Sequence, residues 1–420
     1  MAKETIQSIK GTKDILPDQS HGWQALKVLI RSTMNNYGYK EIRTPVFERT
    51  ELFSRGVGEE TDIVSKEMYS WTDQGGEKLT LKPDLTAPVV RAFIQHNLRE
   101  QSPINKLYYI DTLFRRERPQ KGRYRQFHQF GIEAFGSENP EIDAEVIAVA
   151  LAVLNNLGLE GLTLKLNSIG SPECRTLYRQ EIRSYLKPYL NDLSEISQRR
   201  FDKNPLRILD TKIPHEIEIL NDIPNVSDSW TPEDMAHFEE LKSLLDAMDI
   251  QYSLAPRLVR GLDYYTRTTF VITSSALGAQ DALCGGGRYD GLVKTLGGKA
   301  TPGIGFAAGM ERILLAMGNF DSNINNTQLY IVGLGDTVRP VVVKLAEDLR
   351  QNNIRTNFDS LRRSLKAQMR EANKAGARYA ILIGDQELES GEAELKDLST
   401  GDQEKIALDK LVDHINSLSF

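Results

Sequence analysis

A cluster of positive charge stands out in a chain whose formal net charge is −6. Between Lys106 and Arg125 the sequence has seven Lys or Arg against two acids, an excess of five positive charges. Guanidinium groups stay charged at neutral pH and can bind two phosphate oxygens at once. The segment FRRERPQKGRYRQ, residues 114–126, therefore predicts an anion site, and phosphate is the anion that suits it best.

Two further arginines lie far from this segment in the sequence. Arg260 is part of LVRGLDYYTRTTFVI, and Arg312 is part of GIGFAAGMERILLAM, near the start of an apolar helix. The chain has no G-x-x-x-x-G-K-[ST] motif, and GGGRYDG at 285–291 lacks the strand, helix and downstream acid of a dinucleotide-binding fingerprint. We therefore expect arginine side chains from three segments, rather than a loop of backbone amides, to form the phosphate site.

The elements that position these arginines begin with a predicted β-hairpin. KLYYIDTLF and QFHQFGIEAFG have strand composition and alternation, the polar loop RPQKGRYR joins them, and Arg115 ends the first strand. On the second strand Gln129, Gly131 and Glu133 share one face with Phe127. Gln129 and Glu133 would lie roughly 13 Å apart, with Gly131 leaving an open floor for a small ligand. A half-exposed sheet face without a ligand is the alternative, and the arginines beside it favour the ligand.

Other elements before residue 318 follow from local signals. We predict a helix over His21–Tyr37, a strand in KEIRTPVFE, and an apolar helix that begins at the N-cap Asn139 and ends at Gly158. From about Asn167 to Pro256 the pattern changes to short helical segments, which predicts a helical insertion. GNFDSNINNTQ, residues 318–328, is polar and predicts a linker.

The residues after this linker predict a separate domain. LYIVGLG, IRTNFD and YAILIGD alternate with helices at about 340–351 and 361–377, a β-α-β-α-β order typical of a largely parallel sheet. The second helix carries an unbroken i, i+4 basic ridge, whose members are Arg362, Lys366, Arg370, Lys374 and Arg378. The ridge is either a solvated helix face or a contact with nucleic-acid phosphates.

Composition excludes several classes of protein. A chain of 420 residues with pI near 5.7 is not expected to coat nucleic acid non-specifically, so contacts with nucleic acid should be confined to basic patches. Two cysteines and six histidines show no metal-ligand spacing, so no structural metal is expected. MAKETIQSIKGTKDILP lacks the apolar stretch of a signal peptide, and the longest apolar run is too short for a bilayer. These features indicate a cytoplasmic protein that does not enter a membrane.

Several segments together resemble a known family. FRRERPQKGRYRQFHQFGIE resembles motif 2 of class II aminoacyl-tRNA synthetases, TPGIGFAAGMERILLAM motif 3 and GYKEIRTPVFE motif 1. RGLDYYTRTTFVI and ALCGGGRYDGL resemble the two signature segments of the histidyl-tRNA synthetase family, and IKGTKDILP resembles its N-terminal segment. KPDLTAP, residues 82–88, departs from many bacterial members because Asp84 stands where they have a glutamate.

The resemblance implies a fold and an activity. The fold is an α+β catalytic domain on an antiparallel sheet over residues 1–320, with the helical insertion at about 167–256, followed by an α/β anticodon-binding domain over 328–420. The activity is ligation of histidine to tRNA(His) through histidyl-adenylate, with ATP accompanied by Mg²⁺. Motif 1 implies a homodimer. Adenylate formation needs positioning and neutralisation of charge rather than a protein nucleophile.

The resemblance also implies roles for individual residues. Arg115 and Arg260 are the implied catalytic residues, on either side of the α-phosphate. The implied histidine-binding residues are Asp84, Thr86 and Gln129 for the ammonium, Glu133 and Tyr265 for the imidazole, Arg115 for the carboxylate, Tyr264 and Tyr289 as walls, and Arg260. The implied ATP-binding residues are Arg115, Glu117, Arg123 and Arg312. The expected tRNA-binding residues are Gln120 and Arg125 of the hairpin loop and Arg362, Lys366 and Arg370 of the ridge.

Two other functions are compatible with parts of the sequence. One is a histidine-binding regulatory subunit of ATP phosphoribosyltransferase, a paralogue that typically lacks the C-terminal module and much of the arginine set. The other is a different class II synthetase or a related adenylate-forming ligase, which would have no need of Tyr264 and Tyr265 after an arginine. The presence of all these features favours the histidine–tRNA ligase.

Overall fold

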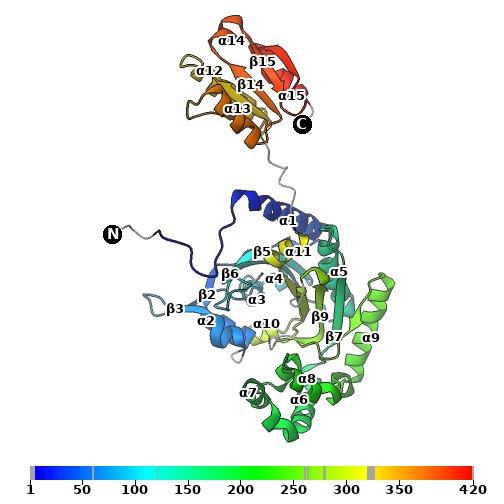
Figure 1. Cartoon of the computed structure of the whole chain (residues 1–420). Coiled ribbons are helices and arrows are strands. Elements are labelled where there is room, and N and C mark those ends of the chain that lie inside the picture. Colours follow the sequence, from blue (N-terminus) through cyan, green and yellow to red (C-terminus); the bar gives the residue numbers. More distant parts are fainter. Residues whose placement is uncertain are drawn as a thin grey trace. The chain divides into compact units, whose positions relative to one another are not determined.

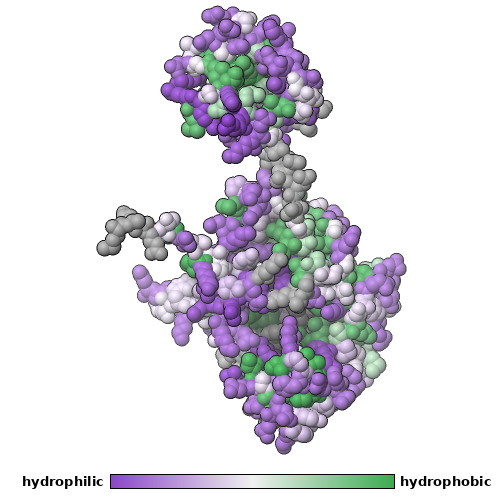
Figure 2. Space-filling model, in the orientation of Figure 1, coloured by the Kyte–Doolittle hydropathy of each residue, from purple (hydrophilic) through white to green (hydrophobic). Residues whose placement is uncertain are grey.

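The chain folds into two compact units, Met1–Phe320 and Asp321–Phe420, which are called the large unit and the small unit below. The computed structural model describes residues 5–58, 61–120, 122–259, 262, 264–277, 281–318 and 327–418. Most of the predicted linker, 319–326, lies outside these residues. Hydrophilic residues predominate on the face of both units seen in Figure 2, as the burial of the apolar clusters inside each unit requires.

An eight-stranded sheet forms the centre of the large unit (Figure 1). The strands lie in the order β1-β5-β6-β11-β10-β9-β7-β8, and all neighbours are antiparallel except the two edge pairs, β1 with β5 and β7 with β8. Their bounds are β1 Lys40–Glu41, β5 Asn105–Phe114, β6 Gln126–Phe135, β7 Leu162–Ser168, β8 Ser253–Leu254, β9 Thr266–Ser274, β10 Ala282–Arg288 and β11 Gly303–Gly309. The predicted antiparallel sheet is confirmed, and β5 and β6 are the predicted hairpin.

Different helices cover the two faces of this sheet. One face packs on α1 (Pro17–Asn36), α5 (Pro140–Asn156), α9 (Pro232–Ala247) and α11 (Met310–Met317). Phe130 and Ile132 of β6 are buried in this core, as their alternation predicts. The other face packs on α3 (Thr86–Gln95), where Tyr109 of β5 and Phe135 of β6 join the core. The predicted ligand-binding face of β6 is therefore the α3 face.

Two predictions about the N-terminal third need correction. The first helix begins at Pro17 rather than His21, because Pro17 takes the first helical position, where its missing N–H costs nothing. The single strand predicted in KEIRTPVFE is two short strands in different sheets: β1 pairs with β5, whereas β2 (Phe47–Arg49) joins β4 (Lys78–Leu81) and β3 (Tyr69–Thr72). Pro45 lies between them and cannot donate a ladder hydrogen bond. By contrast, the helix predicted from Asn139 is confirmed as α5.

Between β7 and α9 the chain forms a helical subdomain with its own core. Its helices are α6 (Pro172–Leu186), α7 (Glu195–Lys203) and α8 (Pro214–Ile219), which Figure 1 shows gathered in green away from the sheet. Tyr178, Ile182 and Leu206 are buried in a cluster separate from the sheet core. Both ends of the predicted insertion, 167–256, belong to the sheet region, because β7 extends to Ser168 and β8 pairs with it. The buried apolar residues of α9 belong to the sheet core with α5, and not to the core of the helical subdomain.

The small unit has a five-stranded sheet in the order β13-β12-β14-β15-β16. The three predicted strands are β12 (Leu329–Gly333), β13 (Thr356–Phe358) and β14 (Tyr379–Ile383), and they are parallel as predicted. β15 (Glu392–Asp397) and β16 (Gln403–Ala407) extend the sheet in the antiparallel sense. Buried clusters lie on both faces, under α12 (Arg339–Gln351), α13 (Leu365–Lys374) and α15 (Leu411–Ser417).

The basic ridge of the small unit is shorter than predicted. α13 begins at Leu365. Arg362 precedes it and has a φ of +58°, a left-handed conformation that excludes Arg362 from the helix. Lys366, Arg370 and Lys374 are exposed on the helix, while Arg378 follows it and pairs with Asp397 at 2.8 Å. The unbroken five-member ridge is therefore wrong, and three of its members form the helical part.

Candidate active site

A cavity of about 390 Å³ lies on the α3 face of the large sheet. Strands β6, β10 and β11 contribute Gln129, Gly285 and the backbone around Phe306, and the start of α3 contributes Thr86. Eight residues predicted for the site line this one cavity: Asp84, Thr86, Arg115, Arg123, Gln129, Tyr264, Tyr265 and Tyr289. Asp62 and Arg207 line it as well, although no pattern in the sequence indicated them.

Glu133 lies beneath this cavity as a buried acid. Its side chain is 1% exposed and accepts hydrogen bonds from three hydroxyl groups. The Thr86 hydroxyl donates to Oε1 at 2.7 Å, the Tyr109 hydroxyl donates to Oε1 at 3.2 Å, and the Tyr289 hydroxyl donates to Oε2. The four side chains come from β6, α3, β5 and the residue after β10. They form a polar floor in an otherwise buried region.

The environment of Glu133 favours its neutral form. Burial is the largest influence and raises the pKa of Glu133 from 4.5 to about 8. The hydroxyl donors oppose this rise, whereas the nearby carboxyl of Asp84 adds to it. Glu133 is thus set to hold a proton at neutral pH, and a cationic or donating ligand would be needed to favour the carboxylate.

The open floor that we predicted above Gly131 is occupied by a tyrosine. Tyr109 pairs with Gly131 across the hairpin, and its hydroxyl lies 2.5 Å from where a Cβ on Gly131 would be. Glycine at this position therefore makes room for Tyr109, not directly for a ligand. The sequence could have indicated Tyr109. If the two predicted strands are paired outward from the loop that joins them, Tyr109 stands opposite Gly131.

Asp84 and Arg115 lie together at the edge of the cavity. Asp84 is buried just before α3, and its Oδ2 accepts from the Ala87 N–H at 3.1 Å. Burial raises the pKa of Asp84, while this N–H and the charge of Arg115 lower it. The Nε of Arg115 donates to the Pro83 carbonyl at 2.8 Å, and its guanidinium lies 5.2 Å from the centre of the Phe127 ring. These contacts fix the direction of Arg115 without using its two terminal nitrogens.

Two more arginines come close together beyond Arg115. The largest influence on Arg312 is burial, which lowers its pKa, and the neighbouring Arg123 guanidinium lowers it further. Glu117 pairs with Arg123 at 3.3 Å, and Gly122 of the hairpin loop approaches the Arg312 side chain. Two cations held this close favour the binding of an anion between them. The structure thus brings the hairpin loop and α11 together, as the predicted phosphate site requires.

Aromatic rings form the far wall of the cavity. The rings of Tyr264 and Tyr265 are 4.7 Å apart, and Tyr264 lies 5.7 Å from Tyr289 in an edge-to-face arrangement. Gly287 of β10 leaves room for Tyr265, since a Cβ there would lie 2.9 Å from the Tyr265 ring. Of the three consecutive glycines in ALCGGGRYDGL, only Gly285 lines the cavity.

The remaining predicted residues lie elsewhere or cannot be placed. Arg260 lies outside the described residues. Arg125 donates to the Lys10 carbonyl at 3.2 Å and packs against Gly11, so it contacts the N-terminal segment. Gln120 is exposed in the hairpin loop. Arg362, Lys366 and Arg370 are exposed in the small unit. Within the described part of the chain no group of three or more His, Cys, Asp or Glu side chains could hold a metal ion.

Known proteins show the same organisation. A family described as histidyl-tRNA synthetase matches residues 11–313, and an anticodon binding domain matches residues 328–418. Over 412 residues the chain is 47% identical to the histidine–tRNA ligase of Thermoanaerobacter pseudethanolicus, which covers 97% of this chain and 99% of that protein. The crystal structure of apo histidyl-tRNA synthetase from S. aureus has a TM-score of 0.84 and 38% identity, and covers 98% of this chain and 100% of that one.

A more distant likeness concerns the fold alone. A structure described as an ATP phosphoribosyltransferase regulatory subunit/histidyl-tRNA synthetase from Bacillus halodurans has a TM-score of 0.66 at 23% identity, and covers 91% of this chain and 99% of that one.

The raised pKa of Glu133 predicts a pH dependence of stability. Between about pH 4.5 and 8 the folded protein keeps the proton that an unfolded chain releases, so the folded state binds more protons. The free energy of unfolding of the wild type must therefore fall with rising pH through this window, by on the order of a few kcal/mol from this group. Glu133→Gln removes the titration, so wild type should lose stability relative to this variant as the pH rises.

Urea unfolding followed by tryptophan fluorescence measures this effect. Trp23, Trp71 and Trp230 all belong to the large unit, so the signal reports on that unit alone. Glu138→Gln, an exposed position three residues after β6, is the matched control. A difference between wild type and Glu133→Gln that stays constant from pH 5.5 to 8.5 would show that Glu133 is already ionised in the folded protein.

Proposed function

The chain belongs to the histidyl-tRNA synthetase family and is an ATP-dependent histidine–tRNA ligase, and we propose that the cavity on the α3 face is the site where it activates histidine. The reaction forms histidyl-adenylate and pyrophosphate from histidine and ATP, and then transfers histidine to the 3′ end of tRNA(His). The observation that supports this site best is that Arg115 lines the same cavity as Asp84 and Arg123. The Arg115 guanidinium would thus lie between the group proposed to bind the amino acid and the group proposed to bind the phosphates.

We propose that Asp84, Thr86 and Gln129 bind the ammonium group of histidine. A buried carboxyl beside a hydroxyl and an amide suits a cation with three donors, because each N–H can be given an acceptor. Asp84 is shorter than the glutamate of many relatives, and its carboxyl remains at the N-terminus of α3. The imidazole would then lie over the polar floor, between Glu133 and Tyr265, with Tyr264 and Tyr289 as walls.

Binding of the imidazole changes the proton balance at Glu133. A neutral imidazole that approaches a protonated carboxyl can accept its proton and form an imidazolium–carboxylate pair, which is stronger than a neutral hydrogen bond. Because the pKa of Glu133, about 8, lies above the usual pKa of imidazole, this transfer is unfavourable by itself, and the attraction within the resulting ion pair would have to drive it. This contact would distinguish histidine from amino acids of similar size that lack a basic ring.

ATP is proposed to bind along the arginines. Arg115 and Arg260 would hold the α-phosphate, and Arg123 and Arg312, with Glu117 beside them, would hold the terminal phosphates. The histidine carboxylate attacks the α-phosphorus and pyrophosphate leaves, so negative charge moves onto oxygens that these cations face. We propose that Mg²⁺ enters as part of the ATP substrate, held by its phosphates.

Further proposals concern partners and location. Gln120 and Arg125 of the hairpin loop are proposed to contact the acceptor end of tRNA. The small unit, with Arg362, Lys366 and Arg370, is proposed to contact its anticodon region.

We also propose a homodimer through the motif 1 segment, where Val46 and Phe47 are exposed hydrophobic residues. A monomer mass in light scattering at micromolar concentration would contradict it. A cytoplasmic location is proposed because protein synthesis consumes the product there. None of the described helices is long and apolar enough to cross a membrane.

The regulatory-subunit alternative is not supported. The chain carries an anticodon binding domain at 328–418, and its likeness to the Bacillus halodurans protein shows only the fold. The Arg123–Arg312 pair has no use in a protein that only senses histidine. The same reasoning sets aside a different class II ligase, because the family match extends over residues 11–313 and relatives at 47% identity act on histidine.

ATP–pyrophosphate exchange across the twenty amino acids tests the activity at the proposed site. Wild type should exchange best with histidine, and Glu133→Gln should raise the KM for histidine far more than the KM for ATP. Removing a partner in a buried polar contact typically costs about 1–3 kcal/mol, or roughly five- to a hundredfold in KM. Equal increases in both KM values would mean that Glu133 does not read the imidazole.

Arg260→Ala should separate catalysis from binding. A cation directed at the reacting phosphate contributes most in the transition state, so the rate of adenylate formation should fall by roughly 10² or more. Histidine affinity, measured by calorimetry, should stay within about fivefold of wild type. The exposed Arg257→Ala, three residues away, is the control and should change neither quantity. Equal losses of affinity and rate would assign Arg260 to substrate binding or to structure.

The basic residues of the small unit predict a salt-dependent tRNA contact. Replacing Lys366 and Arg370 by Gln should lower tRNA affinity and flatten its dependence on log salt by roughly 0.7–0.9 for each phosphate that is no longer neutralised. Histidine activation should be unaffected, because the residues lie in a different unit from the cavity. Lys344→Gln, on the exposed side of α12, serves as the matched control. An unchanged salt slope would leave these residues as a solvated face.

A further inference from the structure

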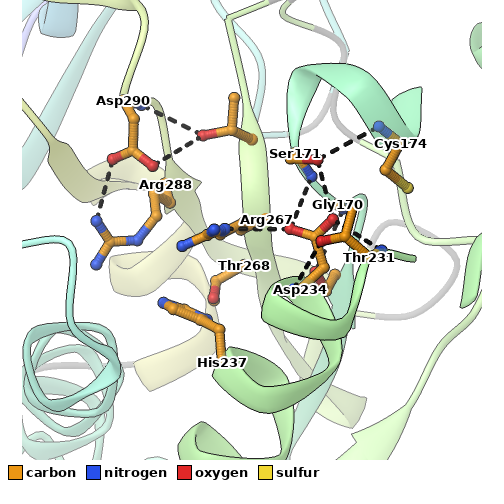
Figure 3. Close-up of polar contacts among 12 residues, drawn as sticks. Gly170, Ser171, Cys174, Thr231, Asp234, His237, Arg267, Thr268, Arg288 and Asp290 are labelled. Atoms are coloured by element: carbon orange, nitrogen blue, oxygen red, sulfur yellow. Dashed lines mark hydrogen bonds and ion pairs between the residues drawn. The ribbon is translucent and has the colours of Figure 1, made fainter. Parts of the chain in front are cut away.

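Asp234 is a buried acid at the point where the helical subdomain leaves the sheet (Figure 3). It lies in the first turn of α9, and its two oxygens accept four hydrogen bonds. The N–H of Ser171 and the Nε of Arg267 donate to Oδ1 at 3.1 and 3.2 Å. The hydroxyl of Ser171 and the N–H of Thr231 donate to Oδ2 at 2.9 and 3.4 Å. A carboxylate accepts about four hydrogen bonds, so Asp234 is saturated.

These four donors come from three separate segments. Ser171 is the N-cap of α6, where the subdomain begins, and Thr231 is the N-cap of α9, where it ends. Arg267 belongs to β9 of the large sheet. Burial by itself raises the pKa of Asp234, but the bonds from Ser171 and Thr231 outweigh it and hold that pKa below its usual value. One charged group therefore ties both ends of the subdomain to β9.

The strand at this point has an unusual backbone. Arg267 has a φ of +48°, a left-handed conformation that is uncommon for a residue with a side chain. Its N–H donates to the Gly170 carbonyl, and its own carbonyl accepts from Ile169, each at 2.8 Å. The backbone of Arg267 is thus held from the segment that precedes α6, and its side chain is held from α9.

A second contact connects the subdomain to the cavity itself. Arg175, one turn into α6, donates from Nη1 to the backbone carbonyl of Tyr265 at 2.6 Å. Tyr265 lines the cavity two residues before Arg267. Residues 265–267 are therefore held at two points by the ends of the subdomain. Arg175 of α6 binds the carbonyl of Tyr265, and Asp234 of α9 binds the side chain of Arg267.

The opposite side of this stretch is braced within the sheet. The N–H of Asp290 donates to the Thr266 hydroxyl at 3.3 Å, and Arg288 donates to Asp290 at 3.0 Å. Arg288 is 0% exposed and is also paired with Asp143 of α5. Thr266 is therefore held from the sheet side. If Arg175 were lost, Thr266 would stay in place, and the backbone of Tyr265 is the part that would be free to shift.

We propose that Arg175 is a positioning residue for histidine recognition. From the helical subdomain it holds the backbone of Tyr265, while Asp234 fixes the start of α6, the helix that carries Arg175. The inference rests on the proposed role of Tyr265 in reading the imidazole. Arg175 touches no substrate in this scheme. Its effect should fall on histidine more than on ATP, because three of the four arginines proposed for ATP come from the hairpin loop and α11. The fourth, Arg260, precedes Tyr265 by five residues.

Steady-state pyrophosphate exchange tests the proposal with the full chain. Arg175→Ala should raise the KM for histidine about tenfold, as expected when a charged donor to a buried carbonyl is removed, and leave the KM for ATP within about twofold. Arg175→Lys should recover part of the loss, since an ammonium can donate to one carbonyl. Arg175→Gln, which keeps a donor but no charge, replaces the alanine variant if that variant fails to fold, and should show an intermediate rise.

Arg183→Ala is the matched control. Arg183 lies two turns later on α6 and also donates to backbone carbonyls, those of Phe201 and Asp202, but both lie within the subdomain. It should leave both KM values unchanged. If Arg183→Ala and Arg175→Ala raise the histidine KM equally, the effect is general loosening of the subdomain and the proposal is overturned. A folded Arg175→Ala with wild-type histidine KM overturns it too.

A double-mutant cycle with Tyr265→Phe separates this inference from the proposed function. If Arg175 acts through Tyr265, the double variant should raise the histidine KM by clearly less than the product of the two single effects. A full product would overturn the coupling. If Tyr265→Phe alone has no effect, the proposed role of Tyr265 fails and the inference fails with it. If Tyr265→Phe raises the KM and Arg175→Ala does not, only the inference is wrong.

Discussion

The need to satisfy one buried acid governs the architecture around the candidate active site. Glu133 is almost completely buried, and a polar group removed from water without partners costs several kcal/mol, more if it is charged. Its hydroxyl donors come from β5, α3 and the residue after β10, so these elements must keep their register to one another. The Glu133 side chain leaves no space for a Cβ on Gly305, and the Tyr289 ring leaves none on Gly303. Two of the three glycines of β11 are thus a steric consequence of the buried acid and its partner.

Acidic and basic groups both surround the cavity. Asp84 lines it above the buried Glu133, and Arg123 lines it with Arg312 near enough to lower the pKa of that arginine. Each group is destabilised by its surroundings: the acids are driven toward their neutral forms, and two guanidinium groups repel each other. The proposed ligands, with a basic ring and an ammonium on one side and phosphates on the other, would relieve both costs. Part of the binding free energy would then come from the charge that the ligands neutralise.

Local patterns in the sequence predicted the elements that depend on neighbouring residues. The hairpin of β5 and β6, the apolar face of β6 and helix α5 follow from alternation, turn residues and an Asn-Pro start. Features set by distant segments were missed or wrong. Tyr109 above Gly131 requires the hairpin register, the division of KEIRTPVFE between two sheets requires the position of β4, and the break in the basic ridge depends on the left-handed turn at Arg362. For the candidate site, the sequence predicted eight of the residues that line the cavity. It did not predict contacts such as that between Arg207 and Asp62 at 2.9 Å, because these residues are 145 positions apart and no local pattern connects them.

The attachment of the helical subdomain shows why a charged group is suited to this junction. A buried carboxylate is weak evidence for stability, since desolvation offsets most of its attraction to partners, but its hydrogen bonds have strict geometry. Asp234 has no spare acceptor, so neither α6 nor α9 can tilt about its first turn without leaving a buried group unsatisfied. An apolar junction of similar size would resist separation but permit sliding. The subdomain and strand β9 must therefore move together at this root, and Tyr265 is the cavity residue nearest to it in the chain.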